Sequence, residues 1–133
     1  MKLGTPTRFV SGISVDPNNP NHAYISYSGY SAYSPGGHVY EVRVNPATGT
    51  GTAKDLSGNL GDQPITDVVQ VPSTGSLYAS TDFGVVTRAA GSANWVATPG
   101  LPHVAVYGLT LDRSNQTLYA ATHGRSIWKL HVG

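Results

Sequence analysis

Short apolar segments alternate with polar turns along the whole chain. Runs rich in Val, Ile, Tyr and Thr are bounded by Pro, Asn, Gly and Ser. The run Val10 to Val15 ends at the turn cluster Asp16 to Asn21, and the run Val68 to Val71 ends at Pro72 to Gly75. No window keeps the i, i+3, i+4, i+7 spacing of an amphipathic helix for three turns. This pattern predicts an all-β protein with almost no helix.

One tetrapeptide pattern returns at a near-constant interval. The segments Leu77–Thr81 and Leu118–Thr122 both read apolar-Tyr-small-small-Thr, and their tyrosines stand 41 residues apart. A similar segment around Tyr24 lies 54 residues before Tyr78, with a longer loop after it. Periods of about 40–50 residues with four strands each are typical of β-propeller blades. A sandwich or a small barrel is also compatible with short alternating strands, but the repeat favours a propeller.

The repeat predicts three blades in one domain, residues 1–133, with blades at about 9–57, 65–98 and 103–133. The fold class expected is all-β, with about three four-stranded antiparallel blades that make a partial or half propeller. Strands are expected at 10–15, 23–27, 38–44 and 52–56, at 67–71, 77–81, 84–88 and 94–98, and at 104–111, 118–122 and 126–132. The third blade lacks an outer strand, which the segment Met1 to Arg8 could supply.

Composition narrows the class of protein further. Hydrophobic residues make up 39% of the chain, enough for a packed core, and charged residues make up 11%. The net charge of +1 is too small for the basic surface of a nucleic-acid-binding protein. Cysteine is absent, so disulfides and thiolate metal sites are excluded. No apolar run approaches the ~20 residues of a membrane span, and the first residues do not form a signal peptide. We therefore expect no nucleic-acid partner and no membrane span.

Three segments carry a resemblance to a known superfamily. They are Ile13 to Pro20, Gly100-Leu101-Pro102, and Leu118 to Arg125. Together they resemble the C-terminal blades of the sialidase-like propellers, which carry bacterial neuraminidase (Asp-box) repeats. The resemblance implies a β-propeller and favours an extracellular or secreted location. The family's Asp-box is eroded here, since Ala90 to Trp95 keeps the tryptophan but has no aspartate. The three arginines and the tyrosine–glutamate pair of a sialidase cannot be matched, so sialidase activity does not carry over.

Three blades also predict something about assembly. They leave two open apolar flanks, whereas propellers close with about 4–8 blades. Closure must come from outside the chain. We expect either a homo-oligomer, with a dimer of six blades preferred, or the remaining blades of a longer parent protein.

Propeller geometry places the chemically interesting side chains on one rim. The loops between strands 2 and 3, and those between blades, open on the same side of a propeller. They contain the candidate ligand-binding residues Tyr27, Tyr30, Tyr33, His38, Asp62, Asp82, His103, His123 and Arg125. Tyrosines among small polar residues suit stacking on sugar rings, although they could instead pack on their own blade.

Two further readings of these residues stay open. Asp82, His123 and Arg125 could bind a polar ligand or act as an acid/base pair, or they could simply cap turns and form ion pairs. The five histidines show no close ligand pair, so neither a metal nor a cofactor is expected.

The sequence therefore favours a binding or structural module that presents a rim to glycan or protein. The alternative is a glycoside hydrolase fragment or an oligomeric glycosidase, with Asp62, Asp67 and Asp82 as the available carboxylates. No catalytic set can be assigned.

Overall fold

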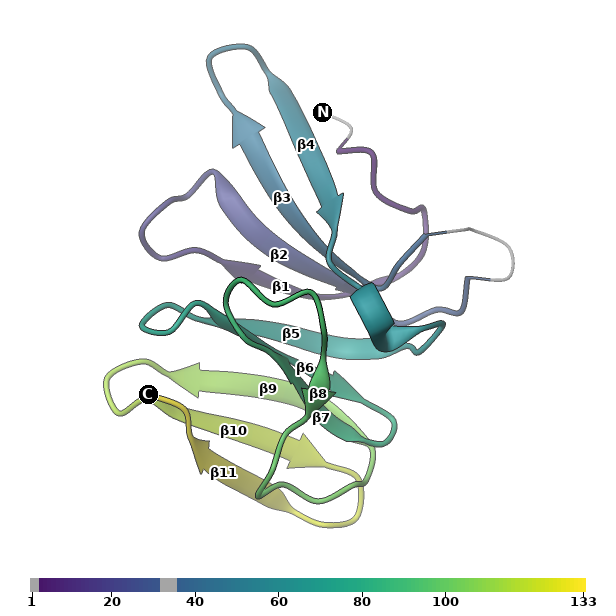
Figure 1. Cartoon of the computed structure of the whole chain (residues 1–133), viewed down its shortest axis with the longest axis vertical. Helices are drawn as coiled ribbons and strands as arrows, with labels where there is room; N and C mark the ends of the chain where they lie inside the picture. The colour runs from purple at the N-terminus through teal and green to yellow at the C-terminus, as the bar shows by residue number, and fades with distance from the viewer. Residues whose placement is uncertain (1–2, 32–35) are drawn as a thin grey trace.

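The computed structural model describes residues 3–31 and 36–133 and shows three antiparallel sheets stacked one upon another (Figure 1). Each sheet follows chain order from its inner to its outer strand, and we call the sheets blades one, two and three. Blade one contains β1 (Val10–Val15), β2 (His22–Tyr27), β3 (Val39–Asn45) and β4 (Thr50–Asp55). Blade two contains β5 (Ile65–Val71), β6 (Ser76–Thr81), β7 (Gly84–Arg88) and β8 (Val96–Ala97). Blade three contains β9 (Val106–Asp112), β10 (Thr117–Thr122) and β11 (Ile127–His131).

The expected all-β architecture is confirmed. Every expected strand forms, with each end within two residues of its expected position. The helical structure in the described residues is the single 3-10 turn η1, Gly58–Leu60, which joins blade one to blade two. Because each strand pairs with its sequence neighbour within the same blade, strand-and-turn periodicity is sufficient to place it.

The strand register confirms the sequence repeat at the level of single residues. Each inner strand has one β-bulge near its first residue, opposite the last residues of the second strand of the blade. The bulge residues are Ser11, Thr66 and Tyr107. Counted from the bulge, Tyr24, Tyr78 and Tyr119 hold the same position on the second strand of their blades. The three blades are therefore structural copies of one unit.

Apolar layers between the blades form the core. One cluster joins blade one to blade two and contains Tyr24, Val39, Leu56, Ile65, Val68, Leu77, Ala79 and Trp95. A second joins blade two to blade three and contains Val71, Val85, Leu101, Val106, Leu109, Leu118, Ala120 and Val132. Blade two is thus covered on both faces. This burial stabilises the fold, because apolar surface removed from water contributes about 25 cal/mol per Å².

The N-terminal segment lies on blade one. Leu3 packs against the cluster of Ile25, Tyr27, Tyr40 and Val42 on the face of blade one that is turned away from blade two. The expectation that this segment supplies the outer strand of blade three of the same chain is therefore wrong. The physical reason is that blade one offers an uncovered apolar face directly beside the start of β1.

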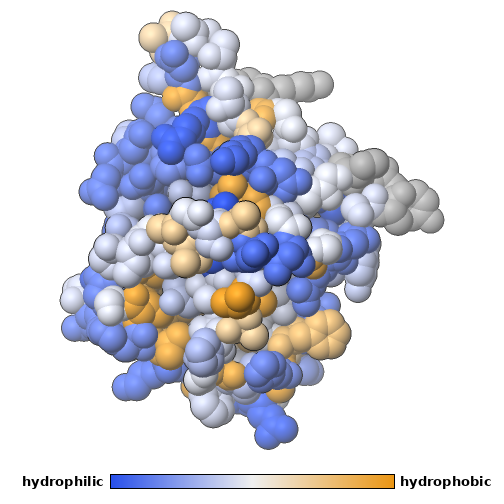
Figure 2. Space-filling view, in the orientation of Figure 1, coloured by the Kyte–Doolittle hydropathy of each residue, from blue (hydrophilic) through white to orange (hydrophobic). Residues whose placement is uncertain are grey.

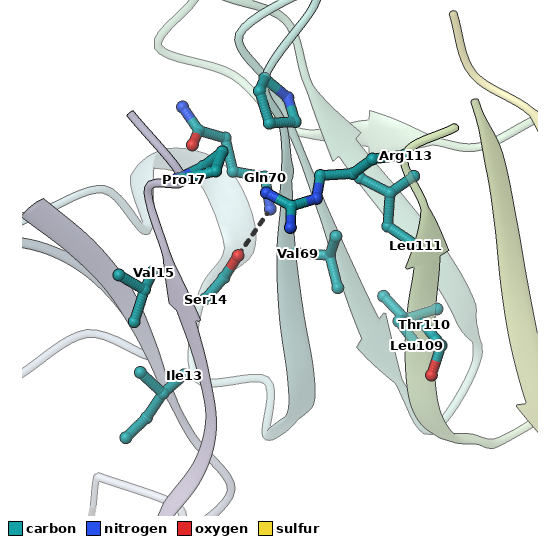
Figure 3. Close-up of a pocket in the computed structure, with 11 residues that line it drawn as sticks. Ile13, Ser14, Val15, Pro17, Val69, Gln70, Leu109, Thr110, Leu111 and Arg113 are labelled. Atoms are coloured by element: carbon teal, nitrogen blue, oxygen red, sulfur yellow. Dashed lines mark hydrogen bonds between the residues drawn. The ribbon is translucent and has the colours of Figure 1, made fainter. Parts of the chain in front are cut away.

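The inner strands line an open groove of about 330 Å³ (Figure 3). Val15, Val69 and Leu109, one from each blade, lie along it as expected for the inner strands of a propeller. The inner strands β1 and β5 are joined here by a hydrogen bond from the Gln70 backbone N–H to Ser14 Oγ at 3.1 Å. Arg113 extends over the same groove. The inner strands of the three blades thus meet at one open groove.

Candidate functional site

The turns between the second and third strands of all three blades lie on the same side of the molecule, at the right in Figure 1. The Thr81 to Gly84 turn and the Thr122 to Arg125 turn are equivalent hairpin connections in blades two and three. The rim geometry expected from the repeat is therefore present. One candidate, Tyr33, falls outside the described residues.

A surface hollow of about 290 Å³ lies on this rim, between the long loop of blade one and the tight turn of blade two. Its lining is Tyr30, Leu60, Asp62, Gln63, Pro64, Asp82 and Phe83. Both aromatic residues are largely exposed, Tyr30 at 64% and Phe83 at 73%. The hollow therefore combines two exposed aromatic rings with two carboxylates and one amide.

Asp62 is held by the blade-one loop. Its Oδ1 accepts the backbone N–H of Ser31 at 2.9 Å and lies 2.9 Å from Nε2 of His38. These contacts, with the Ser31 hydrogen bond as the larger cause, lower the pKa of Asp62 below its ordinary value. Asp62 is therefore a stable anion and a hydrogen-bond acceptor at neutral pH, and it is poorly suited to act as a general acid.

Asp82 and Phe83 are presented by a two-residue hairpin turn. The hydroxyl of Thr81 accepts the Phe83 backbone N–H at 3.0 Å and donates to the carbonyl of Gly84 at 3.0 Å. Gly84 has φ +122°, a region that favours glycine, and a Cβ there would lie 3.2 Å from the Pro102 carbonyl oxygen. The Thr81 hydrogen bonds and Gly84 thus fix the turn, and Phe83 is largely exposed.

Two of the candidate rim residues support the loop from inside. Tyr27 and His38 are each 1% exposed. The Nδ1 of His38 lies 3.1 Å from the carbonyl oxygen of Tyr27, so the imidazole bridges that carbonyl and Asp62. Arg8 donates hydrogen bonds to the carbonyls of Gly29, Gly36 and Gly37 and lies 5.6 Å from the centre of the Tyr27 ring. These side chains hold the loop ends together; Tyr27 and His38 are buried, and Arg8 is half-buried.

The remaining candidates, His103, His123 and Arg125, do not line this hollow. His103 lines a second hollow of about 200 Å³, which shares Gln63 and Phe83 with the first. In blade three, Nδ1 of His123 lies 2.8 Å from the Tyr107 hydroxyl, and the two rings meet edge to face. Among the described residues Asp82 and His123 make no hydrogen bond to each other, so the structure does not bring them together as an acid/base pair.

Several residues of the rim were not singled out as site residues by the sequence. Phe83, Gln63 and Tyr107 carry no sequence motif that marks them as site residues. Asp67, considered as a rim carboxylate, instead accepts the Leu109 backbone N–H at 2.9 Å and is partly buried between blades. Its pKa is raised by that burial. An exposed aromatic residue in a two-residue turn is the signal that could have identified Phe83.

Other kinds of site find no support in the described part of the chain. Within residues 3–31 and 36–133 there is no group of three His, Asp or Glu side chains that could hold a metal ion. No helix in these ranges has the length and apolarity needed to cross a membrane. The lining of the rim hollow, with its aromatic rings and hydrogen-bonding groups, is suited to a polar organic ligand.

Neither a scan of protein-family models nor a search of curated proteins finds a match for the chain. Among solved structures, it is similar to a gluconolactonase from Xanthomonas campestris, XC5397, with a TM-score of 0.67 and 16% identity. That alignment covers 95% of this chain and 38% of the gluconolactonase. A chain of the mitotic checkpoint complex aligns with a TM-score of 0.62 and 15% identity, over 92% of this chain and 36% of the other.

These likenesses bear on the fold alone. Both neighbours have propeller folds, and this chain spans less than two fifths of the length of either. The sialidase-like superfamily is not confirmed by them. The three stacked antiparallel sheets, the shared strand register and the match to these larger structures together show that the chain has a β-propeller fold.

Proposed function

We propose that the chain is a glycan-binding module built on an incomplete β-propeller, with the rim hollow as its binding site. The observation that carries this proposal is the pairing of exposed Tyr30 and Phe83 with Asp62, Gln63 and Asp82 in one hollow. Large apolar side chains exposed together on a surface are uncommon without a ligand or a partner.

The chemistry of the hollow matches that of a sugar. Aromatic rings offer flat apolar surfaces to the C–H faces of a pyranose. Carboxylates accept hydrogen bonds from sugar hydroxyls, and the amide of Gln63 can both donate and accept. Asp62, kept ionised by Ser31 and His38, is an acceptor already oriented before a ligand arrives.

Assembly is part of the same proposal. The two outer faces of the three-blade stack are to be covered by further blades, supplied by a second copy of the chain or by a longer parent protein. The share of each neighbour that the chain covers, 38% and 36%, supports an incomplete propeller. We further propose that the chain is related to the sialidase-like propellers, which its sequence resembles.

Glycan binding can be tested by screening the purified chain on a glycan array and measuring positive hits by isothermal titration calorimetry. Phe83→Ala and Tyr30→Ala should each weaken binding about tenfold or more, since a stacking aromatic side chain contributes on the order of 1–3 kcal/mol. Phe83→Tyr keeps the ring and should retain binding.

Tyr119→Ala is the matched control, because Tyr119 is an aromatic residue 40% exposed on blade three and away from the hollow. The proposal is wrong if no glycan binds, or if Phe83→Ala binds as tightly as the unmodified chain. Cleavage of a bound glycan, lost on Asp82→Asn, would indicate a glycoside hydrolase instead.

A further inference from the structure

A repeated hydrogen bond joins each blade to the next one along the chain. In blade one the bulge residue Ser11 donates its hydroxyl hydrogen to the carbonyl of Ile65 at 2.6 Å. In blade two the bulge residue Thr66 donates to the carbonyl of Val106 at 2.5 Å. Ile65 and Val106 are the residues just before the bulge in the following blade. The same donor position therefore meets the same acceptor position twice.

A buried serine on the second strand completes this contact. Ser26 Oγ lies 2.9 Å from Ser11 Oγ, and Ser80 Oγ lies 2.7 Å from Thr66 Oγ1. Both serines are 0% exposed. Each bulge hydroxyl has one hydrogen, and its shortest contact is to the carbonyl of the following blade; the Thr66 hydroxyl also lies 3.1 Å from the Ser80 carbonyl oxygen. When that hydrogen is given to the following blade, the serine hydroxyl donates to the bulge oxygen. We call this arrangement of bulge hydroxyl, serine and carbonyl the hydroxyl clasp.

The rear face of blade one, meaning the face turned away from blade two, has the features that receive such a contact. By register, Val10 of blade one is equivalent to Ile65 and Val106. Val10 is 43% exposed, whereas Ile65 and Val106 are 0% and 1% exposed. Ile13 is 64% exposed, and its equivalents in blades two and three, Val68 and Leu109, are 1% and 6% exposed.

Figure 3 shows Ile13 and Val15 pointing away from β5, on the side of β1 opposite to Ser14. Between the other blades, the side chains at the register position of Ile13, namely Val68 and Leu109, are covered by a neighbouring sheet. At the register position of Val15, Gln70 and Leu111 are half-buried and line the groove. The β1 part of the rear face of blade one is therefore exposed apolar surface of the kind that is covered between the other blades, whereas Leu3 of the N-terminal segment packs over its β2 and β3 part.

The forward face of blade three, turned away from blade two, lacks the donor side of the clasp. Its bulge residue is Tyr107, and the position of Ser26 and Ser80 is taken by Ala121. The Tyr107 hydroxyl lies at the tip of a long side chain that is 60% exposed, and it bonds His123 instead of a neighbouring backbone. A second copy of the chain cannot offer Val10 the hydroxyl that Ile65 and Val106 receive.

We infer that the rear face of blade one docks a blade that carries Ser or Thr at its bulge position and Ser on its second strand, and that a second copy of this chain is not that partner. This inference narrows the assembly part of the proposed function and does not involve the rim hollow. The partner is a sheet of the same repeat type, since the equivalent surfaces of blades two and three are covered by such sheets.

The inference can be tested by building the missing donor into blade three. The double variant Tyr107→Thr, Ala121→Ser serves as the probe, and the variant Tyr107→Val with native Ala121 is its matched control without the new hydroxyls. Sedimentation equilibrium at micromolar concentrations should show the unmodified chain and the control as monomers. The double variant should associate head to tail, with a dissociation constant lower by about tenfold or more, the effect of two added hydrogen bonds.

A third change identifies the receiving face. Adding Ile13→Asp to the double variant should abolish the gain, because the aspartate would be buried against the docked blade. Circular dichroism verifies that each variant is folded, and glycan binding should be equal in all of them, which separates this test from that of the rim hollow.

Two results would overturn the inference. One is a dimer of the unmodified chain as tight as that of the double variant, and the other is a folded double variant that associates no better than its control. Thr66→Val supplies an independent measurement inside the chain. It should shift the folded-to-unfolded ratio about tenfold or more towards unfolding, as expected for the loss of the hydrogen bonds to the Val106 carbonyl and to Ser80 Oγ, and no shift would contradict the role of the clasp.

Discussion

Blades one and two are copies of one unit, yet their equivalent side chains have different surroundings. Val68 of blade two packs between two sheets, whereas Ile13 holds the same register position on the outer side of blade one and is 64% exposed. The two inner strands have similar sequences and the same bulge. The comparison teaches that in a stacked-sheet fold a blade's neighbours decide which of its apolar residues form the core.

The largest expected effect comes from placing a carboxylate at these two equivalent positions. Val68→Asp should cost more than about 4 kcal/mol and leave the chain unfolded or nearly so, because an unpaired carboxylate would be buried in the core. Ile13→Asp should change stability by no more than about 0.5 kcal/mol, since its side chain already contacts water. Urea unfolding followed by circular dichroism measures both. Equal losses would show that Ile13 is covered in solution.

A second pair of equivalent positions carries glycine. At Gly12 an added Cβ would lie 2.3 Å from Asp67 Oδ1, 2.9 Å from Ser26 Oγ and 3.0 Å from the Asp67 Cα. At Gly108, the equivalent position in blade three, the nearest atom is Asp67 Oδ2 at 3.8 Å.

Gly12→Ala should therefore destabilise the chain by about 1–3 kcal/mol, because the two inner strands must separate. Gly108→Ala should stay within about 0.5 kcal/mol of the unmodified chain. The midpoints of thermal unfolding will show the difference, and a tolerated Gly12→Ala would mean that blades one and two are less tightly packed than described.

The architecture could be predicted because its determinants are local in sequence. Within each blade every strand pairs with the next strand in the chain, and the turns between them consist of residues with turn preferences. The run Val10 to Val15 and its turn therefore identify a strand without tertiary information. The tyrosine spacing of 41 residues then identified equivalent strands, which the register of Tyr78 and Tyr119 confirms.

The site was harder to predict because accessibility is a tertiary property. Tyr27 and His38 have side chains typical of binding sites, but the N-terminal segment and Asp62 enclose them. Asp67 belongs to the same loop-and-strand region as Asp62, yet its carboxylate turns inward to the backbone of blade three. Residue type and loop position indicated which side chains could bind a ligand, and interblade packing decided which of them reach the surface.

Asp62 and Asp67 give the smallest of the expected effects, and they act in opposite directions. The pKa of Asp62 is lowered in the fold by the Ser31 and His38 contacts, so its contribution to stability is present above its unfolded value of 3.8 and is lost as the pH falls below it. The pKa of Asp67 is raised in the fold by burial. Its contribution is present below 3.8 and is lost as the pH rises through the higher folded pKa.

Urea titrations from about pH 3 to pH 7 on Asp62→Asn and Asp67→Asn can separate these two contributions. The Asp62→Asn variant should lose less stability than the unmodified chain on acidification below 3.8, because its rim group no longer takes up a proton. The Asp67→Asn variant should lose less stability as the pH is raised above 3.8, because no charge then forms between the blades. Only the slopes are compared, since the amides also change pH-independent hydrogen bonds. Parallel pH profiles for the two variants would mean that both carboxylates have the same environment, which would contradict the contrast between an open rim and a covered blade interface.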